Sequence, residues 1–353
     1  MEFARLAEYL PSVERSLAAS YDAARRRSAA PFRPYLERSR EFTLRGGKRF
    51  RALLVLAGYH LASRKDPSAA VPAAAALEHF QSWMLVHDDI IDRSERRRGG
   101  PTLHKAFAAD HAARANGGDS ERYGAAVGIT LGDLEESFTV EAFLSSRAPA
   151  VRRLAALAEY VRMTRLTAYG QLLDIRNSDI DVAAVSEEDV LLVHRLKSAV
   201  YTVSAPLRIG AILGGARPAL LDDLEAFGDA SGVAFQLRDD VLGTGFDAEG
   251  SGKSANDLTE GKRTLLVVHA WRRGTDADRT AIRAVLGRTS ASGAELDAAR
   301  QAIRRSGSLD YSESRIATLA ASAMRRIRRS RSLDGSGKAL LGEVADRLVR
   351  RSV

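Results

Sequence analysis

Apolar residues recur at intervals of three and four along nearly the whole chain, which is the periodicity of helices that bury one face. Runs of alternating β-branched residues, which would indicate strands, are scarce. Four glycine pairs separate the periodic stretches, at 46–47, 99–100, 117–118 and 214–215. The pattern predicts helices over about residues 2–27, 34–45, 48–64, 71–95, 121–145, 149–176, 187–213 and 217–243, and again from about 257 to the end.

No repeat and no low-complexity linker divides the 353 residues, so we expect one all-α domain, 1–353. Hydrophobic residues make up 45% of the chain, which allows a sizeable core. The absence of cysteine excludes disulfides, a thiol nucleophile and thiolate metal sites. No stretch approaches the ~18 uncharged apolar residues of a membrane span, and the charged N-terminus does not resemble a signal peptide. A cytoplasmic protein without a membrane span is therefore expected.

The formal charge of +8 and the pI of about 9.9 raise the possibility of a nucleic-acid partner. Much of the excess lies in "AMRRIRRSRS" at 323–332, where no aromatic residues are interleaved. No zinc, helix-turn-helix or RNP pattern accompanies this run. A solvated helical face explains the run better than a nucleic-acid site, and anionic small molecules remain alternative partners. We therefore expect no nucleic-acid partner.

The stretch "MLVHDDIIDRSERRRGGPTLH" at 84–104 combines carboxylates and guanidinium groups. On a helix, Asp88 and Asp92 are one turn apart, and like charges at that spacing destabilise the helix by a few tenths of a kcal/mol. A cation between them would reverse that effect. Mg²⁺ is the natural candidate, because it is held by one or two carboxylates together with substrate phosphates. The following arginines suit the remaining phosphate oxygens. The alternative is a solvated, salt-bridged helix end.

Two further groups extend this chemistry. "FQLRDDVLGTGFD" places Gln236, Asp239 and Asp240 on another helix, and a glycine-rich stretch with lysines follows. Two aspartate pairs that faced each other would bind several metal ions and a diphosphate. "GGKRFR" at 46–51 puts Lys48 and Arg51 three residues apart, which predicts a second anion site at a loop-to-helix junction. A capped basic helix start is the alternative there, although cations oppose the helix dipole at that end.

Together these stretches resemble the polyprenyl diphosphate synthases, or trans-isoprenyl diphosphate synthases, in particular the short-chain geranylgeranyl and farnesyl diphosphate synthases. "DDIID" matches the first aspartate-rich motif, and "RRGGP" from Arg97 matches the arginine signature after it. "GQLLD" (170–174), "KSAVY" (197–201), "FQLRDD" (235–240) and "GKSANDLTEGKRT" (252–264) follow in the family's order, so that the motifs cover about residues 46–266. The resemblance implies a bundle of helices around a central cavity, and a homodimer.

The resemblance also implies a role for each matching residue. It implies three Mg²⁺ ions bound with the allylic diphosphate by Asp88, Asp92 and Asp239, with Asp89 and Asp240 as supporting carboxylates. Contacts to the allylic diphosphate are expected from Arg97, Lys197, Ser198, Gln236, Lys253 and Lys262. Contacts to isopentenyl diphosphate are expected from Lys48, Arg51, Gln81 and Arg98. Among these, Asp88, Asp92, Asp239, Lys197 and Arg97 are expected to be catalytic.

Three positions depart from the family's pattern. Gly243 stands where many members have a third aspartate in the second motif, which should weaken a metal contact without abolishing the site. Ser198 replaces the commoner threonine and keeps a hydroxyl, and Ala52 stands where members often have a proline. None of the three indicates an inactive enzyme.

In the family's reaction the metal ions and basic side chains stabilise the diphosphate that leaves an allylic substrate. The double bond of isopentenyl diphosphate attacks the resulting allylic cation, and a proton is lost. The product tail is expected to run past Met84 and Trp83, where bulky residues shorten the product of family members. One aromatic residue and one methionine favour geranylgeranyl diphosphate, with farnesyl diphosphate as the alternative. Plain core packing is the other explanation of both side chains.

Two other functions are compatible with parts of the pattern. A class I terpene cyclase also uses an aspartate-rich motif, but it has no need for the second anion site of Lys48, Arg51 and Arg98. A non-catalytic subunit of a heteromeric synthase would tend to lose the aspartates, all of which are present here. The prenyltransferase is therefore the favoured interpretation.

Overall fold

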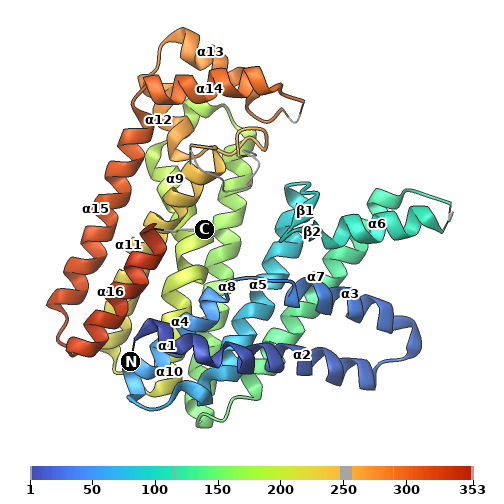
Figure 1. Cartoon of the computed structure of the whole chain (residues 1–353), viewed down its shortest axis with the longest axis vertical. Coiled ribbons are helices and arrows are strands. Elements are labelled where there is room, and N and C mark those ends of the chain that lie inside the picture. Colours follow the sequence, from blue (N-terminus) through green and yellow to red (C-terminus); the bar gives the residue numbers. More distant parts are fainter. Residues whose placement is uncertain (1, 115–116, 247–256, 289, 351–353) are drawn as a thin grey trace. The chain divides into compact units, whose positions relative to one another are not determined.

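The computed structural model describes residues 2–114, 117–246, 257–288 and 290–350 (Figure 1). The described chain is almost entirely helical, with one hairpin of two-residue strands, which confirms the all-α fold. It forms two compact units, one of residues 1–158 and 206–217 and one of residues 159–205 and 218–353.

The first unit contains the helices before the middle of α8, together with α10. In it α7 lies along α5, and α6 packs against α7 (Figure 1). Its elements are α1 (Phe3–Leu6), η1 (Ala7–Tyr9), α2 (Leu10–Arg27), η2 (Ala30–Phe32), α3 (Arg33–Leu44), α4 (Phe50–Ser63), η3 (Pro67–Ala70), α5 (Val71–Ile91), β1 (Arg96–Arg97), β2 (Gly100–Pro101), α6 (Leu103–Ala113), α7 (Ser120–Leu144), the start of α8 (Ala150–Asp179) and most of α10 (Ala205–Gly214).

Helices α4 and α5 form the core of this unit because their sequences are apolar on most faces. The run "ALLVLAG" at 52–58 is buried throughout, and so is "AAAALEHFQS" at 73–82. A helix that is hydrophobic nearly all round requires neighbours on every side. The α5 segment is therefore held rigidly up to the residues that precede its acidic end.

A buried polar cluster joins four helices of the first unit. Glu135 of α7 accepts hydrogen bonds from Tyr21 and from Ser39, the latter at 2.5 Å, and His79 Nδ1 lies 2.8 Å from Glu135 Oε2. All four side chains are buried, and burial raises the pKa of Tyr21 well above its ordinary value. Removing one partner would leave a buried polar group without a hydrogen bond, which would lower the free energy of unfolding by about 1–3 kcal/mol.

The second unit contains the rest of α8 and the C-terminal helices. In it α15 and α16 pack against α11 (Figure 1). Its elements after α8 are η4 (Val182–Ala184), α9 (Glu187–Val193), the π-helix η5 (His194–Ser204), α11 (Pro218–Gly243), α12 (Leu265–Arg273), α13 (Asp276–Val285), α14 (Gly293–Arg305), α15 (Ser308–Arg329) and α16 (Gly335–Arg350). Capping boxes start α9, α13 and α14, and the Ser186–Asp189 pair expected from the sequence is one of them.

Most expected helices are present with ends shifted by a few residues, but four features differ. The helices expected to resume at about 257 begin only at Leu265, because residues 257–261 form turns. The helix expected over 71–95 ends at Ile91, and the residues that follow form the β1–β2 hairpin. Helix α6 was not anticipated. The stretch expected as one helix over 187–213 contains eleven residues of π-helix. Among the described residues, no helix is long and apolar enough to cross a bilayer.

Candidate active site

The first acidic stretch lies at the C-terminal end of α5. Asp92 caps the helix, and its backbone N–H donates to the carbonyl oxygen of Asp88 at 2.8 Å. The two residues are thus one helical turn apart, as the sequence predicted, and both carboxylates leave the same side of the helix end. The carbonyl end of a helix carries partial negative charge, which adds to the demand for a cation there.

Asp89 points away from this pair and into the protein. Its side chain is buried, and Arg97 Nε donates to Asp89 Oδ1 at 2.8 Å. Burial raises the pKa of Asp89 to about 6, although Arg97 acts in the opposite direction. Arg97, which the motif match assigns to the diphosphate, is thus held by Asp89, and the pair fixes the strand that follows α5.

The arginine run forms a hairpin that was missed in the sequence. Arg96 pairs with Pro101 and Arg97 with Gly100, and the two turn residues, Arg98 and Gly99, have φ values of 51° and 76°. Two successive positive φ angles are characteristic of a type I′ hairpin turn, which glycine favours. The glycine after the third arginine was the available signal. As a result Arg97 contacts Asp89, while the guanidinium of Arg98 lies beside Gly47.

The basic loop "GGKRFR" lies next to this hairpin. A Cβ placed on Gly47 would be 3.4 Å from the guanidinium carbon of Arg98. Burial lowers the pKa of Arg98, and the positive charges of Arg49 and Arg51 lower it further. The fold of the first unit therefore gathers cationic groups from two distant segments, as an anion site requires.

Lys48 and Arg51 are not related by a helical turn, contrary to the expectation from their spacing. The helix begins only at Phe50, and Arg49 before it has a left-handed backbone with φ of 49°. Arg51 lies in the first turn of α4, and the exposed Lys48 belongs to the loop. The loop backbone, and not helix geometry, therefore sets the direction of Lys48 relative to Arg51.

Gln81 and Arg98 each bury a polar atom that lacks a hydrogen bond among the described residues, and of the two only Arg98 Nη1 is a donor that suits an anion. Gln81 lies two turns before Asp88 on α5 and is only 7% exposed. Gln81 Oε1 and Arg98 Nη1 make no hydrogen bond within the described part of the chain. A buried polar atom without a partner costs about 1–3 kcal/mol, so such atoms concentrate where a ligand or water completes the bonding.

Arg49 and Glu78 hold the basic loop in place, and neither was identified from the sequence. The buried Arg49 places Nη1 3.3 Å from Glu78 Oε2 and donates through Nη2 to the carbonyl of Thr43 at 3.0 Å. Glu78 also accepts from the backbone N–H of Ala52 at 3.2 Å. A proline at 52 has no such N–H, so the alanine is matched to Glu78 in this chain. A glutamate in the apolar run of α5 was the only sequence signal.

The second acidic stretch lies near the end of α11, in the second unit. Asp240 is buried, and Gln236 Nε2 donates to its Oδ1 at 3.0 Å. His194 Nε2 lies 2.9 Å from Asp240 Oδ2 but does not make a hydrogen bond with it. Asp239, one residue earlier, is partly exposed. Gln236, expected at the diphosphate, thus supports Asp240, and His194 is a further site residue that sequence reasoning missed.

Lys197 extends from the π-helix η5 to α8. Its ammonium lies 2.6 Å from Asp174 Oδ2, the last residue of "GQLLD". Gly170, the first residue of that motif, permits the approach, because a Cβ there would lie 2.3 Å from the backbone nitrogen of Lys197. On the other side of η5, Gly232 of α11 allows an equally close contact with Ala199. The π-helix η5 is eleven residues long and carries the expected Lys197 and Ser198. π-Helical segments are rare in proteins and often mark functional sites.

The lysine-containing loop is described from Asp257 onward. Lys262 Nζ lies 2.6 Å from Glu260 Oε2 and 3.4 Å from Asp257 Oδ1. Lys253, expected at the diphosphate, lies outside the described residues.

Comparison with known proteins identifies the family to which these motifs belong. The family model "Polyprenyl synthetase" matches residues 33–303. The chain belongs to the polyprenyl synthetase family. The chain is 36% identical over 309 residues to the geranylfarnesyl diphosphate synthase of Aeropyrum pernix, and the match covers 87% of this chain and 91% of that one. It is 32% identical to the geranylgeranyl diphosphate synthase of Methanosarcina mazei, covering 87% of this chain and 86% of that one.

A solved structure gives the same result for the fold. The geranylgeranyl pyrophosphate synthase of Corynebacterium glutamicum, complexed with isoprenyl diphosphate and magnesium, has a TM-score of 0.91 to the synthetase at 35% identity. The match covers 98% of this chain and 99% of that one. The chain is therefore a prenyl diphosphate synthase, a transferase of prenyl groups.

The expected ligand residues of the two units carry side chains of the type that a hard divalent cation prefers. Asp88, Asp92 and Asp239 offer carboxylate oxygens, and the chain has no thiol that would favour a softer metal. Among the described residues, no group of three or more histidine or acidic side chains is already arranged around one metal position. Mg²⁺ typically takes one or two carboxylates and completes its shell with water and substrate phosphates, so it suits such donors.

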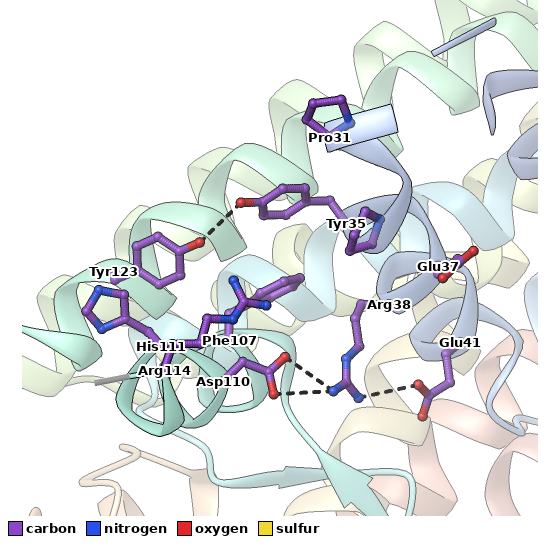
Figure 2. Close-up of a pocket in the computed structure, with 11 residues that line it drawn as sticks. Pro31, Tyr35, Glu37, Arg38, Glu41, Phe107, Asp110, His111, Arg114 and Tyr123 are labelled. Atoms are coloured by element: carbon purple, nitrogen blue, oxygen red, sulfur yellow. Dashed lines mark hydrogen bonds and ion pairs between the residues drawn. The ribbon is translucent and has the colours of Figure 1, made fainter. Parts of the chain in front are cut away.

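The first unit also has a pocket of about 420 Å³ between α3 and α6 (Figure 2). Tyr35 stacks on Phe107 and His111 on Tyr123, and the two tyrosine hydroxyls lie 3.1 Å apart. None of the residues that line it is an expected site residue. The pocket therefore does not contribute to the candidate active site of the synthetase.

Proposed function

We propose that the protein condenses isopentenyl diphosphate with an allylic diphosphate and releases geranylgeranyl diphosphate. The observation that carries the reaction is the acidic end of α5, where Asp88 and Asp92 stand one turn apart and Asp89 is fixed by Arg97. The Corynebacterium glutamicum protein, described with isoprenyl diphosphate and magnesium, supports the choice of substrate and cation.

Asp88, Asp92 and Asp239 are the proposed ligands of three Mg²⁺ ions, and Asp89 and Asp240 are supporting carboxylates. Asp88 and Asp92 belong to the first unit, and Asp239 belongs to the second. When bound, the ions neutralise the diphosphate and favour its departure from the allylic carbon. The proposed contacts to the allylic diphosphate are Arg97, Lys197, Ser198, Gln236, Lys253 and Lys262.

Arg97 and Lys197 are proposed to act through charge as the C–O bond breaks. Each is paired with a carboxylate, Asp89 or Asp174, so its position is fixed before the substrate binds. Preorganised cations stabilise a developing anion without reorganising, which is the largest catalytic contribution in many enzymes. Asp88 and Asp92 are proposed to act by holding the metal ions, and the helix end keeps both carboxylates oriented before the ions bind.

Lys48, Arg51, Gln81 and Arg98 are proposed to hold isopentenyl diphosphate. The neighbouring guanidinium groups and the buried donor Arg98 Nη1, which makes no hydrogen bond within the described residues, support this assignment. A second diphosphate site distinguishes a condensing enzyme from a class I terpene cyclase, which needs only one. A non-catalytic subunit would tend to lose the aspartates of both motifs, and all of them are present in this chain.

The product length is proposed from α5. Trp83 and Met84 lie five and four residues before Asp88, and the indole of Trp83 packs edge-on against Phe80 with ring centroids 5.6 Å apart. A large, supported ring can stop a growing chain where a small side chain would not. Geranylgeranyl diphosphate is therefore proposed, while the Aeropyrum pernix relative favours the geranylfarnesyl product as the second candidate.

The test is product analysis by mass spectrometry after incubation with isopentenyl diphosphate and dimethylallyl, geranyl or farnesyl diphosphate, with Mg²⁺ or with excess chelator. We expect geranylgeranyl diphosphate with Mg²⁺ and none with chelator. Geranylfarnesyl or farnesyl diphosphate as the main product would overturn the proposed length only. A hydrocarbon released from geranylgeranyl diphosphate alone would favour the cyclase, and no elongation of any primer would overturn the reaction.

We also propose that residues 1–353 act as one synthase domain and that two chains form a homodimer. The motifs of the reaction are divided between the two units, so neither unit alone carries all of them. The family match extends over both units.

A further inference from the structure

Arg45 stands between helix α3 and the basic loop. It caps the C-terminal end of α3, and its backbone N–H donates to the carbonyl oxygen of Glu41 at 2.9 Å. The loop of residues 46–49 follows at once, and α4 begins at Phe50. The side chain of Arg45 therefore starts from a fixed point beside the loop that carries Lys48.

The guanidinium group of Arg45 links α3 to the β1–β2 hairpin. Its Nη1 donates to the carbonyl oxygen of Pro101 in β2 at 3.0 Å, and its Nη2 donates to Glu41 Oε1 at 3.0 Å. Hydrogen bonds from a charged donor are stronger than those between neutral groups, and the side chain is partly shielded from solvent, at 22% exposed. The link joins two segments that are 56 residues apart in the chain.

Gly100, the neighbour of Pro101 in β2, leaves room for this guanidinium group. A Cβ built on Gly100 would overlap Nη1 and Cζ of Arg45 and would lie 3.0 Å from its Nε. Gly100 is not among the residues with positive φ, so its backbone does not require glycine. A larger residue at position 100 would push the flexible end of Arg45 away from the carbonyl of Pro101. A glycine in the hairpin is thus matched to an arginine at the end of α3.

The link acts on the part of the hairpin that carries Arg98. Gly100 pairs with Arg97 across the hairpin, and Arg98 lies in the turn between them. The guanidinium carbon of Arg98 lies 3.4 Å from a Cβ position on Gly47, in the basic loop. Arg45 is joined to that loop through the backbone and to the hairpin through its side chain. It therefore sets how far apart the two segments lie.

We propose that Arg45 is a positioning residue for isopentenyl diphosphate, which holds the guanidinium group of Arg98 beside the basic loop before the substrate binds. The proposal rests on the second diphosphate site proposed above, and it assigns Arg45 no contact with the substrate. Groups that are already in place lose less conformational freedom on binding, so preorganisation raises affinity. Arg97 has its own anchor, since Asp89 accepts from its Nε at 2.8 Å, so the link should matter less for the allylic diphosphate.

The test measures the steady-state kinetics of the full chain, with the KM for isopentenyl diphosphate and the KM for geranyl diphosphate determined separately. Four variants are compared: Arg45→Ala, Gly100→Val, the double variant Arg45→Ala/Gly100→Val, and Arg40→Ala. Gly100→Val keeps the charge of Arg45 but takes the space of its guanidinium group. Arg40→Ala is the matched control, because Arg40 is an exposed arginine of the same helix. Thermal unfolding by circular dichroism reports whether each variant is folded.

We expect Arg45→Ala and Gly100→Val each to raise the KM for isopentenyl diphosphate by about fivefold or more, while kcat and the KM for geranyl diphosphate change by less than about twofold. The double variant should match Arg45→Ala, because the link is already lost and the valine has room. Arg40→Ala should match wild type. A wild-type KM for isopentenyl diphosphate in Arg45→Ala or Gly100→Val would overturn the proposal. So would an equal rise in both KM values, or effects of the two substitutions that multiply in the double variant.

Failure of the proposed function gives a different result. If wild type elongates no primer, the reaction is wrong and the role of Arg45 is wrong with it. If wild type elongates geranyl diphosphate and Arg45→Ala does so with an unchanged KM for isopentenyl diphosphate, only the role of Arg45 is wrong. The wild-type assay therefore separates the two failures.

Discussion

Asp89 and Arg97 illustrate how neighbouring residues of one motif take different positions. Asp88 and Asp92 leave the end of α5 on one side, while Asp89 is buried and paired with Arg97 through Nε at 2.8 Å. Removing a partner from a buried ion pair is strongly destabilising, because the remaining charge is left uncompensated. Arg97 therefore stabilises the β1–β2 hairpin to which it belongs, independently of any contact with substrate.

The pKa of Asp89 predicts a pH effect on stability. Its ordinary pKa is 3.8 and burial raises it to about 6, so between these values the folded chain holds a proton that the unfolded chain releases. The contribution of this group to the unfolding free energy should fall as the pH rises from 4 to 6, by on the order of 1–3 kcal/mol. Urea unfolding of Asp89→Asn in chelator should show a flatter pH dependence than wild type. Identical slopes would contradict the assignment.

Trp83 predicts an effect on product length. Trp83→Ala removes the ring that packs against Phe80 and should lengthen the main product by at least one isoprene unit, as measured by mass spectrometry. Trp271→Phe, which alters the other tryptophan of the chain, is the control and should leave the product unchanged. An unchanged distribution in Trp83→Ala would exclude Trp83 as the floor of the tail cavity.

At the scale of elements, the π-helix η5 depends on close backbone contacts. Gly170 of α8 and Gly232 of α11 lie against it from two sides, at Lys197 and at Ala199. The wider π geometry and these two glycines bring Lys197 next to Asp174. The position of the cation is thus decided by how three helical segments pack.

Gly170→Ala tests this packing. The added Cβ would lie 2.3 Å from a backbone nitrogen, which cannot rotate away as a side chain can. We expect α8 and η5 to separate, with a loss of about 1–3 kcal/mol in unfolding free energy and a lower kcat. Gly293→Ala, at a helical glycine with open space around its Cβ position, should cost nothing. A Gly170→Ala enzyme with wild-type stability and activity would refute the close contact.

The start of α4 gives a second prediction for an element. Ala52→Pro removes the N–H that donates to the buried Glu78 at 3.2 Å, and should lower the unfolding free energy by about 1–3 kcal/mol. Ala52→Gly keeps that N–H and should lose less. Chemical denaturation of both variants provides the measurement. A proline variant as stable as wild type would show that the Ala52–Glu78 hydrogen bond contributes little.

At the scale of the whole molecule, each unit has its own buried apolar core. In the first unit residues 52–58 of α4 and 73–82 of α5 are buried, and in the second α11 packs against η5, α12, α15 and α16. The residues proposed for catalysis are distributed over both units. Activity is therefore expected of the complete chain and not of a fragment.

The homodimer is a prediction about the whole molecule. Light scattering during size-exclusion chromatography should give twice the 38.2 kDa mass of one chain. The mass should stay constant on dilution to the concentration used in the activity assay, since the resemblance to the family implies a stable homodimer. A mass of 38.2 kDa at that concentration, in an active sample, would contradict it.

Within the sequence, local patterns determined the helices and the chemistry of the motifs. Helical periodicity depends on residues three and four apart, so the helices over 34–45, 121–145 and 217–243 were predicted to within about a residue. The i,i+4 relation of Asp88 and Asp92 is equally local and is confirmed. The ordered motifs determined the family, which the family model confirms.

The tertiary structure decided where side chains go when their partners are distant in the chain. Arg49 turns inward to Glu78, Gln236 and His194 converge on Asp240, and Asp257 lies over Gly243. None of these pairings follows a helical or strand period, since each depends on how separate helices and loops pack against one another. Periodicity fixes which face of a helix is buried, but only packing selects the residue on the other side.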